Sequence, residues 1–147
     1  MRDRVNILVI FFACVISAQS FSQALQQNHS NANLPSTYEE FTNIVQRDLV
    51  SYFSKIENEK VSTSYELLRK QPTQSGIAYP KFYAWVIVSK NNKVIKQGAI
   101  RLAAINGTKV EVTDFIQSNV IMAKPKSIES VFPKSLCDDI RQRASKT

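Results

Sequence analysis

Three consecutive segments between residues 81 and 116 are rich in apolar residues and are separated by turn-forming residues. The segments are KFYAWVIVSK, KVIKQGAIRLAAI and KVEVTDFI, separated by the dipeptides Asn91-Asn92 and Asn106-Gly107. Both dipeptides tolerate the positive φ that a two-residue hairpin turn requires. The pattern therefore predicts three antiparallel strands joined by two tight hairpins.

Two-residue turns fix the expected register of these strands. Trp85 then lies opposite Gly98, and Phe115 lies on the other side of Gly98, so that two aromatic rings cover a strand glycine. Because both faces of this sheet are apolar, we expect another element to cover each of them. One face is predicted to carry Tyr83, Trp85, Ile87, Ile100, Leu102 and Phe115, and the other Phe82, Ala84, Val86, Val88, Ala99, Ala103, Val110 and Val112.

A long helix is predicted before the strands. Ser36 and Glu39 have the spacing of a capping box, which satisfies free amides of the first helical turn. Apolar side chains then recur at intervals of three and four and form one stripe over about five turns. We expect this stripe to pack on the second face, where alanines allow a helix to approach closely. The stripe consists of Tyr38, Phe41, Val45, Leu49, Tyr52, Phe53 and Ile56.

Residues 61–71 (VSTSYELLRKQ) fit two structures. Alternation over residues 61–67 favours a strand, whereas YELLRK fits a helical turn equally well. The loop-forming residues 72–76 (PTQSG) lead directly into the hairpins. We therefore interpret the segment as the first of four strands.

A second helix is predicted at the C-terminal end of the sequence. Pro133 suits the first helical position, where its missing amide costs nothing. Leu136, Ile140 and Ala144 form a row beside Cys137 that can cover the remaining face of the sheet. The connecting residues 121–132 are expected to include a short strand or turn around residues 120–122. Residues 35–147 are thus predicted to form a single α+β domain: a long helix packed on a four-stranded antiparallel meander, plus a C-terminal helix.

The first twenty residues have the pattern of a secretory signal peptide. Arg2 and Arg4 precede the apolar run ILVIFFACVI, and small residues follow it, which predicts cleavage near Ser20. The run is too short to span a bilayer, which needs about twenty apolar residues. An uncleaved anchor, a core element of the fold and a lipid-modified Cys14 are the alternatives. We expect export, to a bacterial periplasm first and otherwise to the extracellular medium, with no transmembrane segment after cleavage.

Residues 21–34 (FSQALQQNHSNANL) are rich in Gln, Asn and Ser and nearly devoid of aliphatic residues. Such a segment cannot bury enough apolar surface to order itself, so we interpret it as a flexible tether. The tether contains His29, the only histidine of the chain. This position argues against a catalytic or metal-binding role for His29.

The predicted hairpin region is strongly basic. The chain has a formal net charge of +7, and removal of Arg2, Arg4 and Asp3 with the signal peptide lowers it to +6. No acidic residue occurs between Glu66 and Glu111, although this interval contains Arg69, Lys70, Lys81, Lys90, Lys93, Lys96, Arg101 and Lys109. Basic residues interleaved with aromatic ones are typical of a surface that meets an anionic partner. The candidate binding residues are Tyr83, Trp85, Lys90, Lys93, Lys96 and Arg101.

Lysines are common in hairpins, and this favours a simpler interpretation of the same residues. Lysines at strand edges and turns protect a sheet from aggregation.

Several chemistries lack the residues they need. Three glycines exclude a glycine-rich phosphate loop, and Cys137, the only cysteine outside the signal peptide, has neither a disulfide partner nor a histidine to activate it. Asp138 and Asp139 are adjacent on a helix, so their side chains diverge, and no cluster has metal-ligand spacing. We predict no catalytic residue, no metal site and no cofactor.

Three carboxylates leave paired-carboxylate chemistry formally open: Glu66, Glu111 and Asp114. The predicted register directs Glu111 and Asp114 to opposite faces of the sheet, which argues against a shared site. Asp114 is instead expected to form an ion pair with Arg101 across the strand pair.

The predicted element order over residues 36–117 resembles the cystatin-like architecture, which nuclear-transport-factor-2-like proteins share loosely. Cystatins inhibit cysteine proteases through a Gln-x-Val-x-Gly hairpin tip. The hairpin tips here are KNNK (residues 90–93) and INGT (residues 105–108), and the strand expected before the helix is replaced by the polar tether. The resemblance therefore implies a fold and does not imply protease inhibition.

Three hypotheses for function follow. The first is an exported, non-enzymatic binding or assembly protein of the cell envelope, which contacts an acidic protein or another anionic envelope component; a complex subunit comes first, then an inhibitor or immunity protein. The second is a small ligand-binding protein or enzyme with a pocket between helix and sheet, lined by Tyr83, Trp85 and a carboxylate. The third is nucleic-acid binding through Lys90, Lys93 and Lys96.

Overall fold

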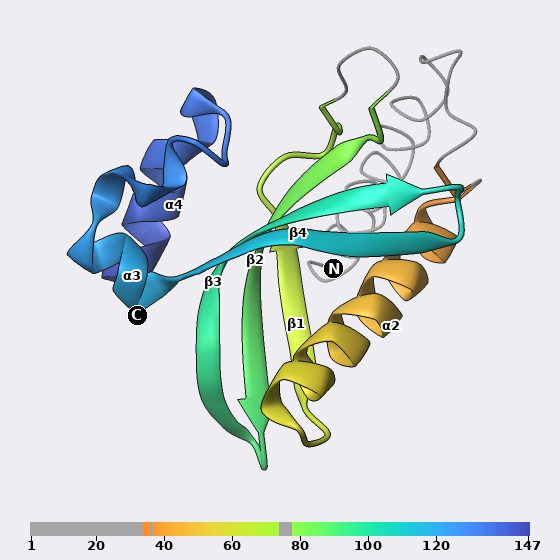
Figure 1. The fold of residues 1–147 in the computed structure, drawn as a ribbon, viewed down its shortest axis with the longest axis horizontal. Coiled ribbons are helices and arrows are strands. Elements are labelled where there is room, and N and C mark those ends of the chain that lie inside the picture. The colour runs from red at the N-terminus through yellow and green to blue at the C-terminus, as the bar shows by residue number, and fades with distance from the viewer. Residues whose placement is uncertain (1–33, 36, 74–77) are drawn as a thin grey trace, which may run out of the picture.

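The computed structural model describes residues 34–35, 37–73 and 78–147. One sheet of four antiparallel strands, in the order β1-β2-β3-β4, follows a long helix and precedes a group of C-terminal helices (Figure 1). The predicted α+β architecture is confirmed. The predicted signal peptide, Cys14 and His29 lie outside the described residues. The elements are α2 (Tyr38–Glu57), β1 (Ser62–Leu67), β2 (Lys81–Lys90), β3 (Lys93–Ile105), β4 (Lys109–Gln117), α3 (Ser118–Ala123), η1 (Pro125–Ile128) and α4 (Lys134–Ser145).

Helix α2 begins one residue later than the predicted capping box requires. Thr37 is the N-cap, and its hydroxyl accepts a hydrogen bond of 3.1 Å from the backbone N–H of Glu40. The pair has the same three-residue spacing as Ser36 and Glu39, so the cap is displaced by one position; Ser36 itself lies outside the described residues. The helix ends at Asn58, which adopts the left-handed conformation.

The apolar stripe of α2 forms the first core of the molecule. Phe41, Val45, Leu49 and Phe53 are fully buried, as predicted, and Ile44 joins them. Tyr38 and Ile56, at the two ends of the stripe, are exposed. The stripe is therefore longer than the surface that the sheet covers.

Both turn positions were predicted correctly, but the register was not. Asn91 and Asn92 have positive φ and close a two-residue turn, as expected. A β-bulge follows at the start of β3, so that Trp85 lies opposite Ala99 and Gly98 lies opposite Val86. The predicted pairing of Trp85 with Gly98 is wrong because the bulge inserts one extra residue.

The second hairpin departs from the predicted register in two ways. Its turn has three residues, since Ile105 pairs with Lys109, and a second irregularity lies between the pairs of Arg101 and Leu102. Phe115 consequently lies opposite Ile100, and Gln117 lies opposite Gly98. Gly98 is not covered by two aromatic rings.

Each bulge adds one residue to the strand, and the side chains beyond it therefore point to the face opposite the predicted one. The β2 residues and Val110 and Val112 lie on the predicted faces. Ile100, Leu102 and Phe115 instead face α2, whereas Ala99 belongs to the opposite face. Phe115 contacts Phe53 edge to face, with the ring centroids 5.0 Å apart.

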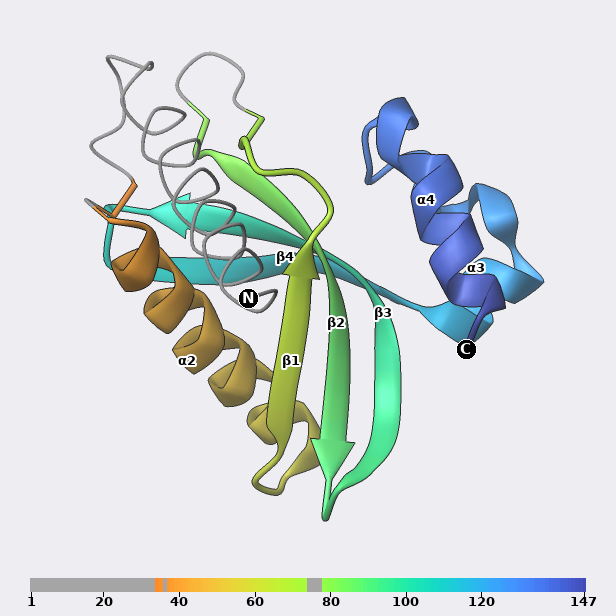
Figure 2. The same ribbon diagram turned by 180° about the vertical axis from the view of Figure 1, so that it is seen from behind.

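The C-terminal helices cover the face of the sheet that points away from α2. Figures 1 and 2 show α2 on one side of the sheet and α3 and α4 on the other. A second core lies between: Tyr83, Trp85 and Ala99 of the sheet pack with α3, η1 and α4. The predicted C-terminal helix is confirmed, although Pro133 is its N-cap and not its first helical residue. Residues 120–122 are helical rather than a strand or turn. The helical part of this core consists of Ile121, Ile128, Phe132, Leu136, Cys137, Ile140 and Ala144.

The sheet curls around α2 until both of its edge strands meet the helix. Gln46 donates a hydrogen bond of 2.9 Å to the backbone carbonyl of Thr63 in β1, and the carboxylate of Asp48 accepts one of 2.8 Å from the N–H of Val110 in β4. Two residues apart on a helix, these side chains project about 200° from each other. One helix thus protects both edges of the sheet.

Candidate functional site

Two of the six candidate binding residues are core residues. Tyr83 and Trp85 lie beneath the C-terminal helices and are only 5% and 6% exposed. The hydroxyl of Tyr83 shares a hydrogen bond of 2.6 Å with that of Thr73. These two aromatic side chains offer almost no surface to a partner.

Arg101 lies on the same face of the sheet and is engaged within the molecule. Its guanidinium forms an ion pair of 2.5 Å with Asp114 and donates a hydrogen bond of 3.2 Å to the carbonyl of Val131. The predicted pairing of Arg101 with Asp114 is confirmed, and the two residues lie directly opposite each other rather than on a diagonal. Arg101 thus links the sheet to the C-terminal helices.

The other three candidates lie at the tip of the β2–β3 hairpin, next to the end of α2. Lys90 forms an ion pair of 2.5 Å with Glu59, and Lys96 forms one with Glu57. Lys93 is exposed and has no ion pair with any residue that the structure describes. The structure therefore divides the six candidates between two places. Tyr83, Trp85 and the partly exposed Arg101 lie beneath the C-terminal helices, and the three lysines lie at the hairpin tip.

Sequence reasoning missed the two glutamates at this site. Glu57 and Glu59 precede the acid-free interval, so counting charges along the chain leaves the hairpin lysines unopposed. The curled sheet brings the end of α2 to the hairpin, and both glutamates meet lysines there. No local sequence pattern reports such a contact, because it depends on the tertiary fold.

We call this part of the molecule the hairpin end and define it as residues 55–60 and 90–96. It forms one extremity of the molecule in both ribbon views (Figures 1 and 2). Lys55 and Lys60 are exposed and, like Lys93, form no ion pair within the described residues. With five lysines and two glutamates, the hairpin end carries a formal charge of +3.

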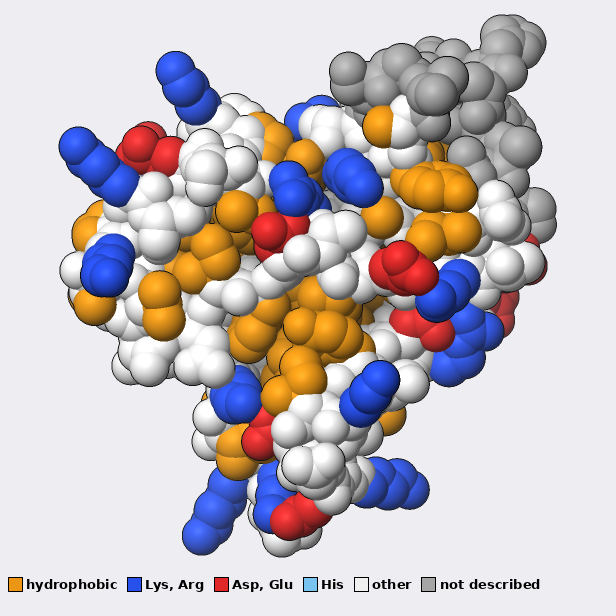
Figure 3. All heavy atoms as spheres, viewed as in Figure 1, with side chains coloured by type: hydrophobic (Ala, Val, Ile, Leu, Met, Phe, Trp, Pro, Cys, Tyr) orange, Lys and Arg blue, Asp and Glu red, His pale blue; other side chains and the backbone are white. Residues whose placement is uncertain are grey.

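Apolar side chains are exposed among these lysines. Ile56, Val94 and Ile95 are 46%, 57% and 39% exposed. Val94 and Ile95 lie at the bulge of β3, where two consecutive aliphatic residues interrupt the alternation of the strand. Figure 3 shows basic side chains projecting from this extremity, below the apolar centre of the molecule.

Two surface hollows follow α2 on the side of β4. Arg47 and Asp48 separate them: Arg47 pairs with Asp48 at 2.8 Å and donates a hydrogen bond to the carbonyl of Thr108. The first hollow, of about 550 Å³, is lined by Thr37, Glu39, Glu40, Asn43, Ile44, Arg47, Gly107 and Thr108. The second, of about 260 Å³, is lined by Asp48, Ser51, Tyr52, Lys109, Val110, Glu111 and Val112.

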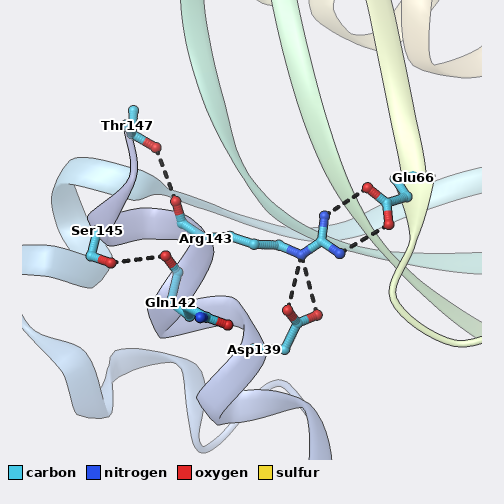
Figure 4. Close-up of polar contacts among 6 residues, drawn as sticks. All are labelled: Glu66, Asp139, Gln142, Arg143, Ser145 and Thr147. Carbon is cyan, nitrogen blue, oxygen red and sulfur yellow. Dashed lines mark hydrogen bonds and ion pairs between the residues drawn. The ribbon is translucent and has the colours of Figure 1, made fainter.

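The carboxylates considered for catalysis are each bound to a different cation. Arg143 of α4 holds Glu66 of β1 through two hydrogen bonds of 2.8 and 3.0 Å and also contacts Asp139 (Figure 4). Hydrogen bonding to Arg143 lowers the pKa of Glu66, and the same bonds raise the pKa of Arg143.

Glu111 and Asp114 depart from the predicted geometry. The bulge in β4 places both on one face of the sheet, since their partners Ala103 and Arg101 are two residues apart in β3. Glu111 pairs with Lys109 at 2.6 Å, however, whereas Asp114 pairs with Arg101. The two carboxylates are engaged separately and form no acid–base pair.

Cys137 has the surroundings of a core residue. It is 4% exposed, and burial raises the pKa of its thiol above the ordinary value. A protonated thiol is a poor nucleophile.

No group of three or more His, Cys, Asp or Glu side chains in the described part of the chain could hold a metal ion. Nor is any helix in that part long and apolar enough to cross a membrane.

Comparisons with protein-family models, with curated proteins and with solved structures found no match to this chain.

Proposed function

We propose that this chain is an exported, non-enzymatic binding or assembly protein of the cell envelope, and that it contacts an anionic partner through the hairpin end. The composition of that end carries the proposal. Both of its glutamates are occupied by Lys90 and Lys96, while three further lysines and three aliphatic side chains face solvent. Exposed apolar groups beside unpaired charges of one sign are typical of an interaction site.

A ligand pocket between α2 and the sheet has less support. Phe41, Leu49 and Phe53 of α2 pack directly on Phe82 and Ile100 of the sheet, and all five are fully buried. The expected pocket residues Tyr83 and Trp85 point to the opposite face. Binding through the surface of the hairpin end requires no such cavity.

Capture from envelope extracts tests the proposal. Tagged protein would be compared with the variant Lys55→Gln/Lys60→Gln/Lys93→Gln, which removes three charges without breaking an ion pair of the described residues. The matched control is Lys124→Gln/Lys126→Gln/Lys134→Gln, which removes the same charge from η1, from the residue before it and from the start of α4. Association would be measured at low and at physiological salt.

We expect the wild type and the control to retain the same envelope component, and the hairpin variant to lose it. The association should weaken with added salt, because exposed charges are screened. Equal retention by all three proteins, or no association of the wild type, would overturn the proposal.

A further inference from the structure

The residue types of the hairpin end distinguish between classes of anionic partner. Protein interfaces are enriched in Tyr, Trp and Arg and depleted of Lys. Residues 55–60 and 90–96 contain no aromatic residue and no arginine. Lysines and the aliphatic Ile56, Val94 and Ile95 are exposed there, together with three asparagines and Glu59, which is paired with Lys90. Nucleic-acid sites likewise use arginine and stacked aromatic rings. Lysines beside apolar side chains also occur on segments that lie at a membrane interface, where the ammonium groups meet anionic headgroups.

The shape of the hairpin end suits a flat partner. It projects from the fold, and the two described hollows lie along α2 and β4, lined by residues outside it. A projecting tip can reach a plane without obstruction from the rest of the molecule. Lysine stems lie along apolar surface while their ammonium groups reach phosphates.

The ion pairs at this end prepare it for such a contact. Lys90 and Lys96 hold Glu59 and Glu57, so no unpaired carboxylate of the hairpin end would face an anionic surface. Each ion pair also joins the hairpin to the end of α2. The exposed aliphatic groups therefore lie at one extremity of the molecule, on two elements that these ion pairs join.

A second surface with lysines and exposed apolar residues lies on α3 and η1, and it is less suitable. Val120 and Met122 are exposed there, near Lys124 and Lys126. Residues two apart on a helix project about 200° from each other, so Val120 and Met122 cannot enter one plane together. This surface provides a control of similar composition.

We propose that the hairpin end docks on a bilayer surface rich in anionic lipids, with Val94, Ile95 and Ile56 entering the headgroup region and Lys55, Lys60 and Lys93 contacting lipid phosphates. The proposal rests on the proposed function and names its partner. Each lysine near an anionic leaflet contributes about fivefold in affinity, so removal of three should weaken binding on the order of 100-fold. Loss of the Val94 and Ile95 side chains should weaken it by about tenfold or more.

Co-sedimentation with vesicles tests this inference. Protein obtained by expression of the full chain would be mixed with vesicles of phosphatidylcholine alone and of phosphatidylcholine with phosphatidylglycerol. The hairpin variants are Lys55→Gln/Lys60→Gln/Lys93→Gln and Val94→Ser/Ile95→Ser. Their controls are Lys124→Gln/Lys126→Gln/Lys134→Gln and Val120→Ser/Met122→Ser. All proteins share the same first 33 residues, so any contribution of that segment is equal throughout.

We expect the wild type and both controls to sediment with anionic vesicles only, and both hairpin variants to remain largely in solution. Circular dichroism would confirm that each variant is folded. Loss of binding in the controls as well would show general charge attraction and overturn the assignment to the hairpin end.

One pair of results separates this inference from the proposed function. If the hairpin variant loses envelope capture but wild type does not bind anionic vesicles, the partner is a protein or polysaccharide: the lipid inference fails and the proposed function stands. If wild type binds an oligonucleotide and no vesicle, nucleic acid is the partner and both fail.

Discussion

Gly98 of β3 lies opposite Gln117, the last residue of β4. A Cβ atom at this position would lie 2.2 Å from the carbonyl oxygen of Ile116 and 2.8 Å from the Cα of Gln117. Both neighbours are backbone atoms and cannot move away without disturbing the strand pair. The requirement for glycine is therefore steric.

The variant Gly98→Ala tests this requirement. We expect it to lower the free energy of unfolding by about 1–3 kcal/mol, the usual range for overpacking. Urea denaturation followed by circular dichroism would measure the change. Gly107→Asn is a suitable comparison, since Gly107 has a φ of +67° that asparagine tolerates, and we expect a smaller loss there. A Gly98→Ala variant as stable as wild type would contradict the steric argument.

The thiol of Cys137 should be unreactive in the folded protein. It is buried against the carbonyls of Phe132 and Pro133, and its raised pKa keeps it protonated at neutral pH. Reaction with a thiol reagent should be slower than in urea-unfolded protein by at least about tenfold. Fast labelling of the folded protein would show that α4 opens readily.

At the residue scale, periodicity predicted which side chains are buried more reliably than which of them meet. The α2 stripe and the apolar β2 residues are in the core, as expected. The register failed because each bulge adds one residue, yet the sequence contains a signal for both. Val94 and Ile95 are adjacent aliphatic residues, and the apolar positions of β4 change from Val110 and Val112 to Phe115.

At the scale of the elements, helix α2 protects the edge strands of the sheet. Asp48 accepts a hydrogen bond from Val110 and thereby occupies an outward-facing amide of the edge strand β4. An unprotected edge strand is a template for pairing with another chain. Asp48 therefore has a role in stability and a role in solubility.

Asp48→Ala should separate these two roles. Loss of the acceptor leaves the Val110 amide without its partner, and we expect a loss of about 1–2 kcal/mol in the free energy of unfolding. Light scattering should also show increased self-association through β4. Asp48→Asn retains a side-chain oxygen acceptor, and its association should stay near that of wild type. Equal scattering from Asp48→Ala and wild type would argue against edge protection.

The contact between α4 and β1 should weaken in acid. Glu66 has a lower pKa in the folded protein than in the unfolded chain, so its contribution is complete above the unfolded pKa and is lost as the pH falls through the folded one. Because Glu66 is largely exposed, this contribution is small, about 0.5 kcal/mol. Glu66→Gln should be less stable than wild type near pH 7, and the difference should shrink in acid. Urea midpoints at both pH values measure this, and a constant difference would exclude the ion pair as its source.

The long elements were predictable, whereas the short helix α3 was not. The apolar residues of α2 recur over five turns, and the hairpins have strong turn signals. Residues 118–123 (SNVIMA) contain valine and isoleucine, and the residue at the N-cap position is Gln117, which makes no side-chain cap hydrogen bond. The local sequence of these residues therefore suggests a strand or a turn. They are helical because Ile121 packs under α4, a contact that the local sequence does not reveal.

On the scale of the whole molecule, two cores share one sheet. Phe82 and Val86 of β2 belong to the first core, and their neighbours Tyr83 and Trp85 belong to the second. Neither core can be lost without exposing one face of the same strands. The two cores should therefore unfold together.

Trp85, the only tryptophan, reports on the second core alone. We expect its fluorescence and the far-ultraviolet circular dichroism of the whole chain to give the same urea midpoint, as in a two-state transition. A tryptophan transition at lower urea would show that α3 and α4 undock before the sheet unfolds.

The sequence predicts a sheet with two apolar faces, so it could be predicted that other elements pack on both faces. The distribution of charge could not, because Glu57 and Glu59 meet Lys96 and Lys90 only after the sheet has curled around α2. The acid-free interval of the sequence is therefore partly neutralised in the fold. At the hairpin end, the lysines without an ion pair among the described residues are Lys55, Lys60 and Lys93.

The length of α2 sets a distance between the two ends of the molecule. Its twenty residues extend about 30 Å, from Thr37 at one end to the hairpin end at the other. A molecule standing on a bilayer by its hairpin end would therefore hold the start of α2, and the 550 Å³ hollow beside it, well above the headgroups. The helix would hold its N-terminal end away from the bilayer, where a second component could bind it.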